Sequence, residues 1–329
     1  MADNEMVPVT ILTGFLGSGK TTLLNRILKE HHGQRIAVIE NEFGEAGVDN
    51  EILVQNKEEQ IIEMNNGCIC CSVRGDLQRI LAELKDKRAD GRLAFDRVII
   101  ETTGMADPGP VAQTFFLDEG IGNYYLLDSV ITLVDAKHAP KQLDEFKEAQ
   151  EQVGFADRIL MSKTDLVSTE DIDKLKTRIV RMNPRAPIKH VHFGDTPIAE
   201  ILDIRGFNLN AILELDPTFL TDAEHEHDEH VSSFVFRSSR PFDGVKLEEF
   251  LSSIVQVYGN DLLRYKGVLS LKGNANRVIF QGVHMLMGGD MGKPWGKDEK
   301  RESVMVFIGR ELPQDIIIQG LEQCLAKPQ

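Results

Sequence analysis

The chain has 329 residues, of which 42% are hydrophobic and 27% charged, a composition typical of globular proteins and a length that favours two domains. Its formal net charge of −15 repels phosphate backbones and anionic lipid, so nucleic-acid or membrane binding is not expected as the main activity. No apolar run approaches the ~18 residues of a membrane span, and the acidic N-terminus does not resemble a secretion signal, so we expect a cytoplasmic protein.

The first part of the chain, residues 1–215, alternates short apolar runs with helical patterns. Strands are predicted at 7–13, 35–39, 61–62, 97–100, 130–134, 158–161 and 188–193, and helices at 21–30 and 76–87. Because most of these strands are apolar throughout, they predict an α/β domain whose mostly parallel sheet has helices on both faces. Such sheets bind ligands at the carboxyl ends of their strands, where Gly14, Glu40, Glu101, Asp135 and Ser162 stand.

The pattern changes after Leu215. Residues 216–231 are acidic and contain His225, His227 and His230, so they predict a linker that is either simply solvated or a weak metal binder. Further on, strands at 233–237, 267–271, 277–281 and 303–308 and helices at 247–258 and 315–324 no longer alternate strictly. They predict a smaller α+β domain over 232–329.

A phosphate-binding loop follows the first predicted strand. Residues 14–21 read Gly-Phe-Leu-Gly-Ser-Gly-Lys-Thr and match the P-loop pattern, with a helix directly after it. Backbone N–H groups in such a loop surround the phosphates, the lysine reaches the β- and γ-phosphates, and the final hydroxyl binds Mg²⁺. The alternative is a glycine-rich turn. The predicted nucleotide contacts here are Gly14, Gly17, Ser18, Gly19, Lys20, Thr21 and Thr22.

Glu101 ends an apolar strand and begins Glu101-Thr-Thr-Gly104. A carboxylate at this place can hold Mg²⁺, and the Gly104 N–H can contact the γ-phosphate, so that the segment senses hydrolysis. The alternative is an ordinary acid at a strand end. Lys20, Thr21 and Glu101 are the predicted catalytic residues, while Glu42 and Asp49 are weaker candidates for a base.

Ser162-Lys163-Thr164-Asp165 also follows a predicted strand. An aspartate here can accept both N1–H and the N2 amino group of guanine, which adenine does not offer, and the Lys163 stem can lie along the base. The alternative is that Ser162 or Asp165 caps a helix. Together with the phosphate loop, Lys163 and Asp165 predict guanine recognition.

Three cysteines lie close together at Cys68, Cys70 and Cys71, while Cys324 stands apart. Thiols stay reduced in the cytosol, where such a cluster favours a metal or redox site, and thiolates suit Zn²⁺ or softer ions. Further ligands are needed, and the acids that follow the second strand are expected at the same end of the sheet: Glu40, Glu42 and Glu45. Buried structural cysteines or a redox pair are the alternatives.

Together these residues resemble the CobW-like family of P-loop GTPases and metallochaperones and, within it, the YjiA type. The resemblance covers nearly the whole chain. Its segments are Thr13-Gly-Phe-Leu-Gly-Ser-Gly-Lys-Thr-Thr22, Glu40-Asn-Glu-Phe-Gly-Glu45, Asn66-Gly-Cys-Ile-Cys-Cys71, Glu101-Thr-Thr-Gly-Met-Ala-Asp-Pro-Gly-Pro110, Leu262-Leu-Arg-Tyr-Lys-Gly267 and Phe280-Gln-Gly282. The resemblance implies a slow GTPase that binds zinc or a related ion, with Glu40, Glu45 and Cys70 at positions associated with zinc and with coupled nucleotide and metal states.

One residue departs from the family. Many members have Asn-Lys-x-Asp where this chain has Ser162, and we expect the shorter serine not to brace the loop as an amide does. The leading hypothesis is a GTP-hydrolysing metallochaperone that uses GTP, Mg²⁺ and Zn²⁺ and serves an unidentified metalloprotein client, with a homodimer left open. The alternatives are a small-molecule kinase, and a metal buffer or redox sensor with a regulatory nucleotide site.

Overall fold

The computed structural model describes residues 6–30, 33–40, 60–63, 73–198, 201–204, 231–296 and 299–327. For Glu40 it describes the backbone alone. Several residues singled out above lie outside these ranges: Glu42, Glu45, Asp49, Cys68, Cys70, Cys71, His225, His227 and His230. The chain divides into two compact units, Met1–Thr177 with Ala186–Phe207, and Arg178–Arg185 with Asn208–Gln329.

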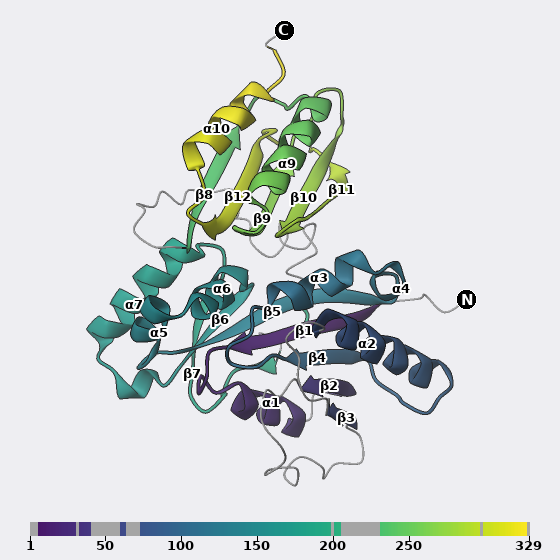
Figure 1. Cartoon of the computed structure of the whole chain (residues 1–329), viewed down its shortest axis with the longest axis vertical. Coiled ribbons are helices and arrows are strands. Elements are labelled where there is room, and N and C mark those ends of the chain that lie inside the picture. The colour runs from purple at the N-terminus through teal and green to yellow at the C-terminus, as the bar shows by residue number, and fades with distance from the viewer. Residues whose placement is uncertain are drawn as a thin grey trace. The chain divides into compact units, whose positions relative to one another are not determined.

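A seven-stranded sheet in the order β3-β2-β4-β1-β5-β6-β7 forms the centre of the first unit (Figure 1). The strands are β1 (Val7–Gly14), β2 (Ile36–Glu40), β3 (Gln60–Glu63), β4 (Arg97–Glu101), β5 (Tyr125–Asp135), β6 (Arg158–Ser162) and β7 (Ile188–Val191). Every described pair is parallel, and β1, β4 and β5 are buried almost throughout. The predicted parallel α/β sheet is therefore confirmed.

Helices connect these strands. They are α1 (Lys20–Lys29), α2 (Val73–Ala89), α3 (Gly109–Leu117), α4 (Glu119–Gly122), α5 (Ala139–Glu145), α6 (Lys147–Phe155), the 3₁₀ turn η1 (Thr164–Leu166) and α7 (Thr169–Met182). Helix α1 packs Leu23, Leu24 and Ile27 against the strands, while α3 and α6 contact β5. Figure 1 shows α1 and α3 on opposite sides of the sheet, as a parallel sheet buried on both faces requires.

The register aligns the carboxyl ends of neighbouring strands. Glu101 on β4 pairs with Leu12 on β1 and with Glu40 on β2, and Asp135 on β5 pairs with Ser162 on β6. The last strand was predicted to reach Phe193, but β7 ends at Val191. The reason is that Phe193 has φ 48°, a left-handed conformation that a strand cannot contain.

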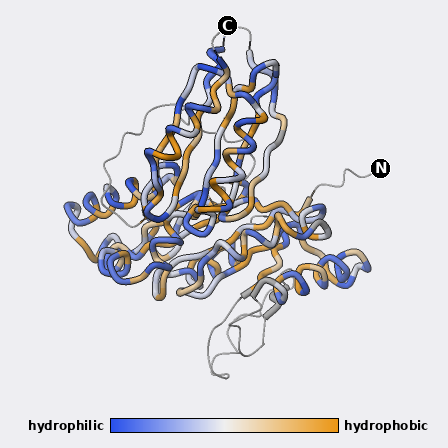
Figure 2. Tube along the Cα trace, turned by 45° about the horizontal axis from the view of Figure 1, so that its top comes forward, coloured by the Kyte–Doolittle hydropathy of each residue, from blue (hydrophilic) through white to orange (hydrophobic). Residues whose placement is uncertain are grey.

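The second unit contains an antiparallel sheet in the order β11-β10-β9-β12-β8. Its elements are β8 (Val231–Ser238), α9 (Gly244–Tyr258), β9 (Leu262–Leu269), β10 (Asn276–Val283), β11 (Leu286–Pro294), β12 (Ser303–Arg310) and α10 (Gln314–Gln323). Leu251 of α9 and Leu321 of α10 pack with Phe307 of the sheet in one core, and Figure 2 shows the hydrophobic runs of these elements. The α+β prediction is confirmed, but it missed β11 and started β9 at residue 267, too late.

Within the described residues, every helix is too short or too polar to span a bilayer.

Candidate functional site

The phosphate loop joins β1 to α1, as predicted. Gly14, Gly17 and Gly19 all have positive φ values, of 143°, 73° and 103°. At Gly14 a side chain is excluded as well, because a Cβ there would lie 2.4 Å from the Leu133 carbonyl oxygen. The loop can therefore curl tightly against β5 and leave its backbone N–H groups near the N-terminus of α1, where the helix dipole favours anions.

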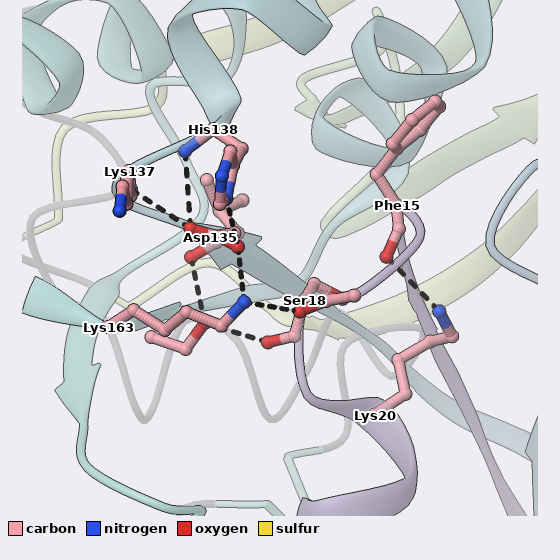
Figure 3. Close-up of polar contacts among 10 residues, drawn as sticks. Phe15, Ser18, Lys20, Asp135, Lys137, His138 and Lys163 are labelled. Carbon is pink, nitrogen blue, oxygen red and sulfur yellow. Dashed lines mark hydrogen bonds and ion pairs between the residues drawn. The ribbon is translucent and has the colours of Figure 1, made fainter.

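The Lys20 side chain folds back onto the start of this loop. Its ammonium donates to the Gly14 carbonyl at 2.7 Å and to the Phe15 carbonyl at 3.3 Å, and the side chain is buried (Figure 3). Burial lowers the pKa of Lys20, and the negative charge of Glu101 offsets part of that effect. A poorly hydrated ammonium in this position can bind phosphate oxygens with little loss of hydration.

Thr21 and Glu101 come together at the carboxyl edge of the sheet. The Thr21 hydroxyl donates to Glu101 Oε1 at 3.0 Å, which joins the first turn of α1 to the end of β4. A hydroxyl and a buried carboxylate are both hard oxygen ligands, so this donor set fits Mg²⁺. Lys20, Thr21 and Glu101 thus form one group beside the phosphate loop.

Two side chains at the end of β6, those of Ser162 and Lys163, form hydrogen bonds to the phosphate loop. Lys163 donates to the Gly17 carbonyl at 2.7 Å and pairs with Asp135 Oδ2 at 2.5 Å, as Figure 3 shows for Lys163 and Asp135. The Ser162 hydroxyl donates to the Ser18 carbonyl at 2.7 Å. The serine was expected not to brace the loop as an amide does, but its hydroxyl does contact the loop, because β6 lies close enough for this short side chain to reach.

Asp135 is the buried anchor of this arrangement. Besides Lys163, its carboxylate accepts from the backbone N–H groups of Lys137 and His138 and contacts the His138 ring at 2.9 Å. Burial alone raises the pKa of Asp135, but its contacts with Lys163 and His138 outweigh that effect and hold the pKa below its usual value. The carboxylate therefore stays ionised and fixes Lys163 against the loop.

Asp165 lies in η1, just beyond β6, with its side chain half exposed. It does not cap the next helix, because Ser168 accepts the Asp171 N–H at the start of α7. The ring of His192, which follows β7, lies 3.5 Å from the Asp165 carboxylate. Asp165 thus lies two residues beyond Lys163, whose ammonium contacts the phosphate loop.

The segment after β4 packs against the phosphate loop. Thr102 donates its backbone N–H to Leu12 and its hydroxyl to Thr13. Gly104 is so close to Leu16 that a Cβ would meet the Leu16 backbone nitrogen at 2.7 Å. The sequence indicated Gly104 but missed Gln152 of α6, whose side chain contacts the same segment.

Of the predicted zinc ligands, only Glu40 falls within the described chain, through its backbone. Its register position on β2 is opposite Glu101 of β4. Since neighbouring strands are about 4.8 Å apart, the backbone of Glu40 lies directly beside that of Glu101. The described residues contain no group of three or more histidines, cysteines or acids able to hold a metal ion.

Comparison with known proteins agrees with this geometry. Residues 8–190 match the model of the CobW/HypB/UreG nucleotide-binding domain, and residues 231–325 match the cobalamin synthesis protein cobW C-terminal domain. The zinc chaperone YjiA of Escherichia coli is 46% identical over 312 residues, covering 94% of this chain and 96% of that protein. The zinc chaperone CobW of Pseudomonas aeruginosa is 35% identical, over 97% and 92% of the two chains.

The crystal structure of Zn(II)-bound YjiA GTPase from E. coli superposes with a TM-score of 0.79 and 39% identity in the structural alignment, covering 98% of this chain and 100% of that one. The two domain models together, and each of the two relatives alone, thus cover residues of both units described above. The chain belongs to the CobW family of P-loop nucleotide-binding proteins.

Proposed function

We propose that this protein is a GTP-hydrolysing zinc chaperone whose nucleotide state controls its affinity for the metal. The observation that supports coupling most directly is the register between β2 and β4, which sets Glu40 opposite Glu101. The predicted zinc-binding acids thus begin on the strand next to the one that ends in the predicted magnesium ligand. The zinc ion is the cargo, while Mg²⁺ is the cofactor of the nucleotide site.

The nucleotide chemistry follows from the residues around the loop. Lys20 and the loop N–H groups would bind the β- and γ-phosphates, and Thr21 and Glu101 would hold Mg²⁺. Bound Mg²⁺ supplies positive charge that stabilises the charge developing on the phosphates during transfer to water. Asp165 and Lys163 would select guanine, with Lys163 kept in place by Asp135.

The zinc cargo would be held by the thiolates of Cys68, Cys70 and Cys71 together with Glu40 or Glu45, ligands that suit this ion. The loss of the γ-phosphate would change the conformation of the segments beside Glu101 and so lower the zinc affinity. The zinc would then pass to an apo-metalloprotein client in the cytoplasm, where the thiols remain reduced. Self-association into a homodimer is compatible with this cycle.

The test measures the Zn²⁺ affinity of the full chain with a non-hydrolysable GTP analogue, with GDP and without nucleotide. We expect affinities that differ by about tenfold or more between the analogue and GDP, a usual size for coupling between sites. Equal affinities in all three states would contradict coupling, because a ligand shifts an equilibrium only through differential binding.

Cysteine variants provide the matched control. Changing Cys68, Cys70 and Cys71 to serine should abolish tight zinc binding and leave GTP binding intact. Cys324→Ser should change neither, since Cys324 is buried in the second unit, where burial raises the pKa of its thiol.

Preference for ATP with phosphate transfer to an acceptor other than water would favour a kinase. Zinc delivery that survives Lys20→Ala would favour a metal buffer.

A further inference from the structure

Helix α6 contains a buried polar residue, Gln152, at a position where an apolar side chain would be expected. Gln152 is 1% exposed, although α6 contacts the apolar strands β1 and β5. Its backbone carbonyl accepts the Thr132 hydroxyl of β5 at 2.7 Å. Burying an amide side chain costs free energy unless its hydrogen bonds are satisfied, so the partners of this side chain are informative.

Both described side-chain hydrogen bonds of Gln152 go to the segment after β4. Its Nε2 donates to the Gly104 carbonyl at 3.2 Å and to the Ala106 carbonyl at 3.0 Å. Between these carbonyls lies a turn in which the Ala106 N–H donates back to Thr103 at 3.2 Å. One amide group of α6 therefore fixes two peptide groups of a single turn.

The same turn is held from its other side by the phosphate loop. Gly104 is buried against the backbone of Leu16, and a single added methyl group would not fit between them. The turn is thus clamped between Leu16 of the loop and Gln152 of α6. The hydrogen bonds to Gln152 hold the turn in place, and the turn can move away from the phosphate loop only if they break.

We propose that Gln152 is a positioning residue for GTP hydrolysis, which holds Gly104 where its N–H can read the γ-phosphate. This inference rests on the proposed GTPase function and adds a residue from α6 to it. Without the two hydrogen bonds the turn relaxes away from the loop, so the protein distinguishes GTP from GDP less well and hydrolyses GTP more slowly. GDP binding, which needs no contact with this turn, is retained.

The chain offers a matched control on the same helix. Gln150 is also buried, and its Nε2 donates to the Leu143 carbonyl of α5 at 2.7 Å, away from Gly104. Gln152→Met and Gln150→Met each replace a buried amide by an apolar side chain of similar length. Both should lower the melting temperature, but only Gln152→Met should alter the response to the γ-phosphate.

The experiment measures affinities for GDP and for a non-hydrolysable GTP analogue, with kcat and KM for GTP, in the full-length variants. For Gln152→Met we expect the ratio of analogue to GDP affinity to fall about tenfold, since one or two buried hydrogen bonds are lost. We expect kcat to fall with it. Gln150→Met should keep both values of the wild-type protein.

Two outcomes would overturn the proposal: a wild-type affinity ratio and kcat in Gln152→Met, or equal changes in both variants. If Gln152→Met does not fold, hydrogen exchange of the wild-type protein decides instead. The GTP analogue should then protect residues 103–106 more than GDP does, and equal protection would refute the proposal. A wild-type protein that neither binds nor hydrolyses GTP would count against the proposed function itself, which is a different result.

Discussion

The Thr21 hydroxyl donates to the Glu101 carboxylate over 3.0 Å, although 80 residues separate them in the chain. This hydrogen bond ties the helix that begins at the phosphate loop to the strand next to β2. The two side chains thus bring oxygen atoms together at one edge of the sheet, and their separation is set by the pairing of β1 with β4. If they bind Mg²⁺ as proposed, loss of either side chain should lower the Mg²⁺ affinity more than it lowers the stability of the fold.

Glu101→Gln tests the magnesium role. The amide can still accept the Thr21 hydroxyl, but it removes the negative charge that attracts the ion. The Mg²⁺ concentration for half-maximal GTP hydrolysis should rise about tenfold or more, since charged contacts contribute roughly 1.5–3 kcal/mol. Glu30→Gln is the control, because Glu30 pairs with Arg26 at the far end of α1. An unchanged Mg²⁺ dependence in Glu101→Gln would exclude Glu101 as a ligand.

Ser162→Ala tests the brace between β6 and the phosphate loop. The variant loses the 2.7 Å hydrogen bond to Ser18 and leaves that carbonyl without this donor. Affinity for GDP should fall about fivefold, the effect of one neutral hydrogen bond of ~1 kcal/mol. The measurement is a titration with fluorescent GDP. Ser168→Ala, which removes only the cap of α7, should leave the affinity unchanged.

Asp165→Asn tests base recognition. Guanine presents two donors to the carboxylate, whereas xanthine replaces the amino group by an oxygen that an amide N–H₂ can contact. The variant should lose about tenfold or more in GTP affinity and gain affinity for xanthosine triphosphate, as measured by competition for the same site. If GTP affinity is unaltered, Asp165 does not read the base.

Asp135→Asn should change how stability depends on pH. The pKa of Asp135 in the folded protein is below its ordinary value of 3.8, so its stabilising effect is complete above about pH 4 and disappears as the pH falls through the folded pKa. Urea unfolding near pH 7 should show the variant less stable by about 2 kcal/mol. The difference from the wild-type protein should narrow below pH 3.8.

The control for that experiment is Asp90→Asn. Asp90 pairs with Arg92 at the protein surface, and surface pairs add little to stability. A pH-independent difference between wild-type and Asp135→Asn would mean that packing, and not the charge of Asp135, stabilises this corner.

Much of the parallel sheet could be predicted because its strands are short, apolar runs that end in polar residues. Helix α6 could not, since buried Gln150, Glu151 and Gln152 interrupt its apolar period. Strand β11 was missed for a related reason. Its sequence, Leu-Met-Gly-Gly-Asp-Met-Gly-Lys-Pro, lacks alternation, and it forms as the edge partner of β10.

The candidate site likewise contains residues that the sequence indicates and contacts that it does not. The phosphate loop and Glu101 follow local patterns that the sequence displays directly. The contacts of Ser162 with Ser18, of His192 with Asp165 and of Gln152 with Gly104 join residues that are far apart in the chain. Only the packing of β6, β7 and α6 brings those pairs together, so no local pattern could indicate them.

The position of β1 in the middle of the sheet determines when the protein can fold during synthesis. Among the described strands, β1 pairs with β4 and β5, through registers such as Val9 with Val98 and Val7 with Tyr125. At bacterial or eukaryotic translation rates, β4 is made about 5 to 20 s after β1, and the apolar first strand waits for it without a partner strand. The hydrogen bond from Lys163 to the Gly17 carbonyl of the phosphate loop can likewise form only once Lys163 has been synthesised, when about half of the 329 residues are made.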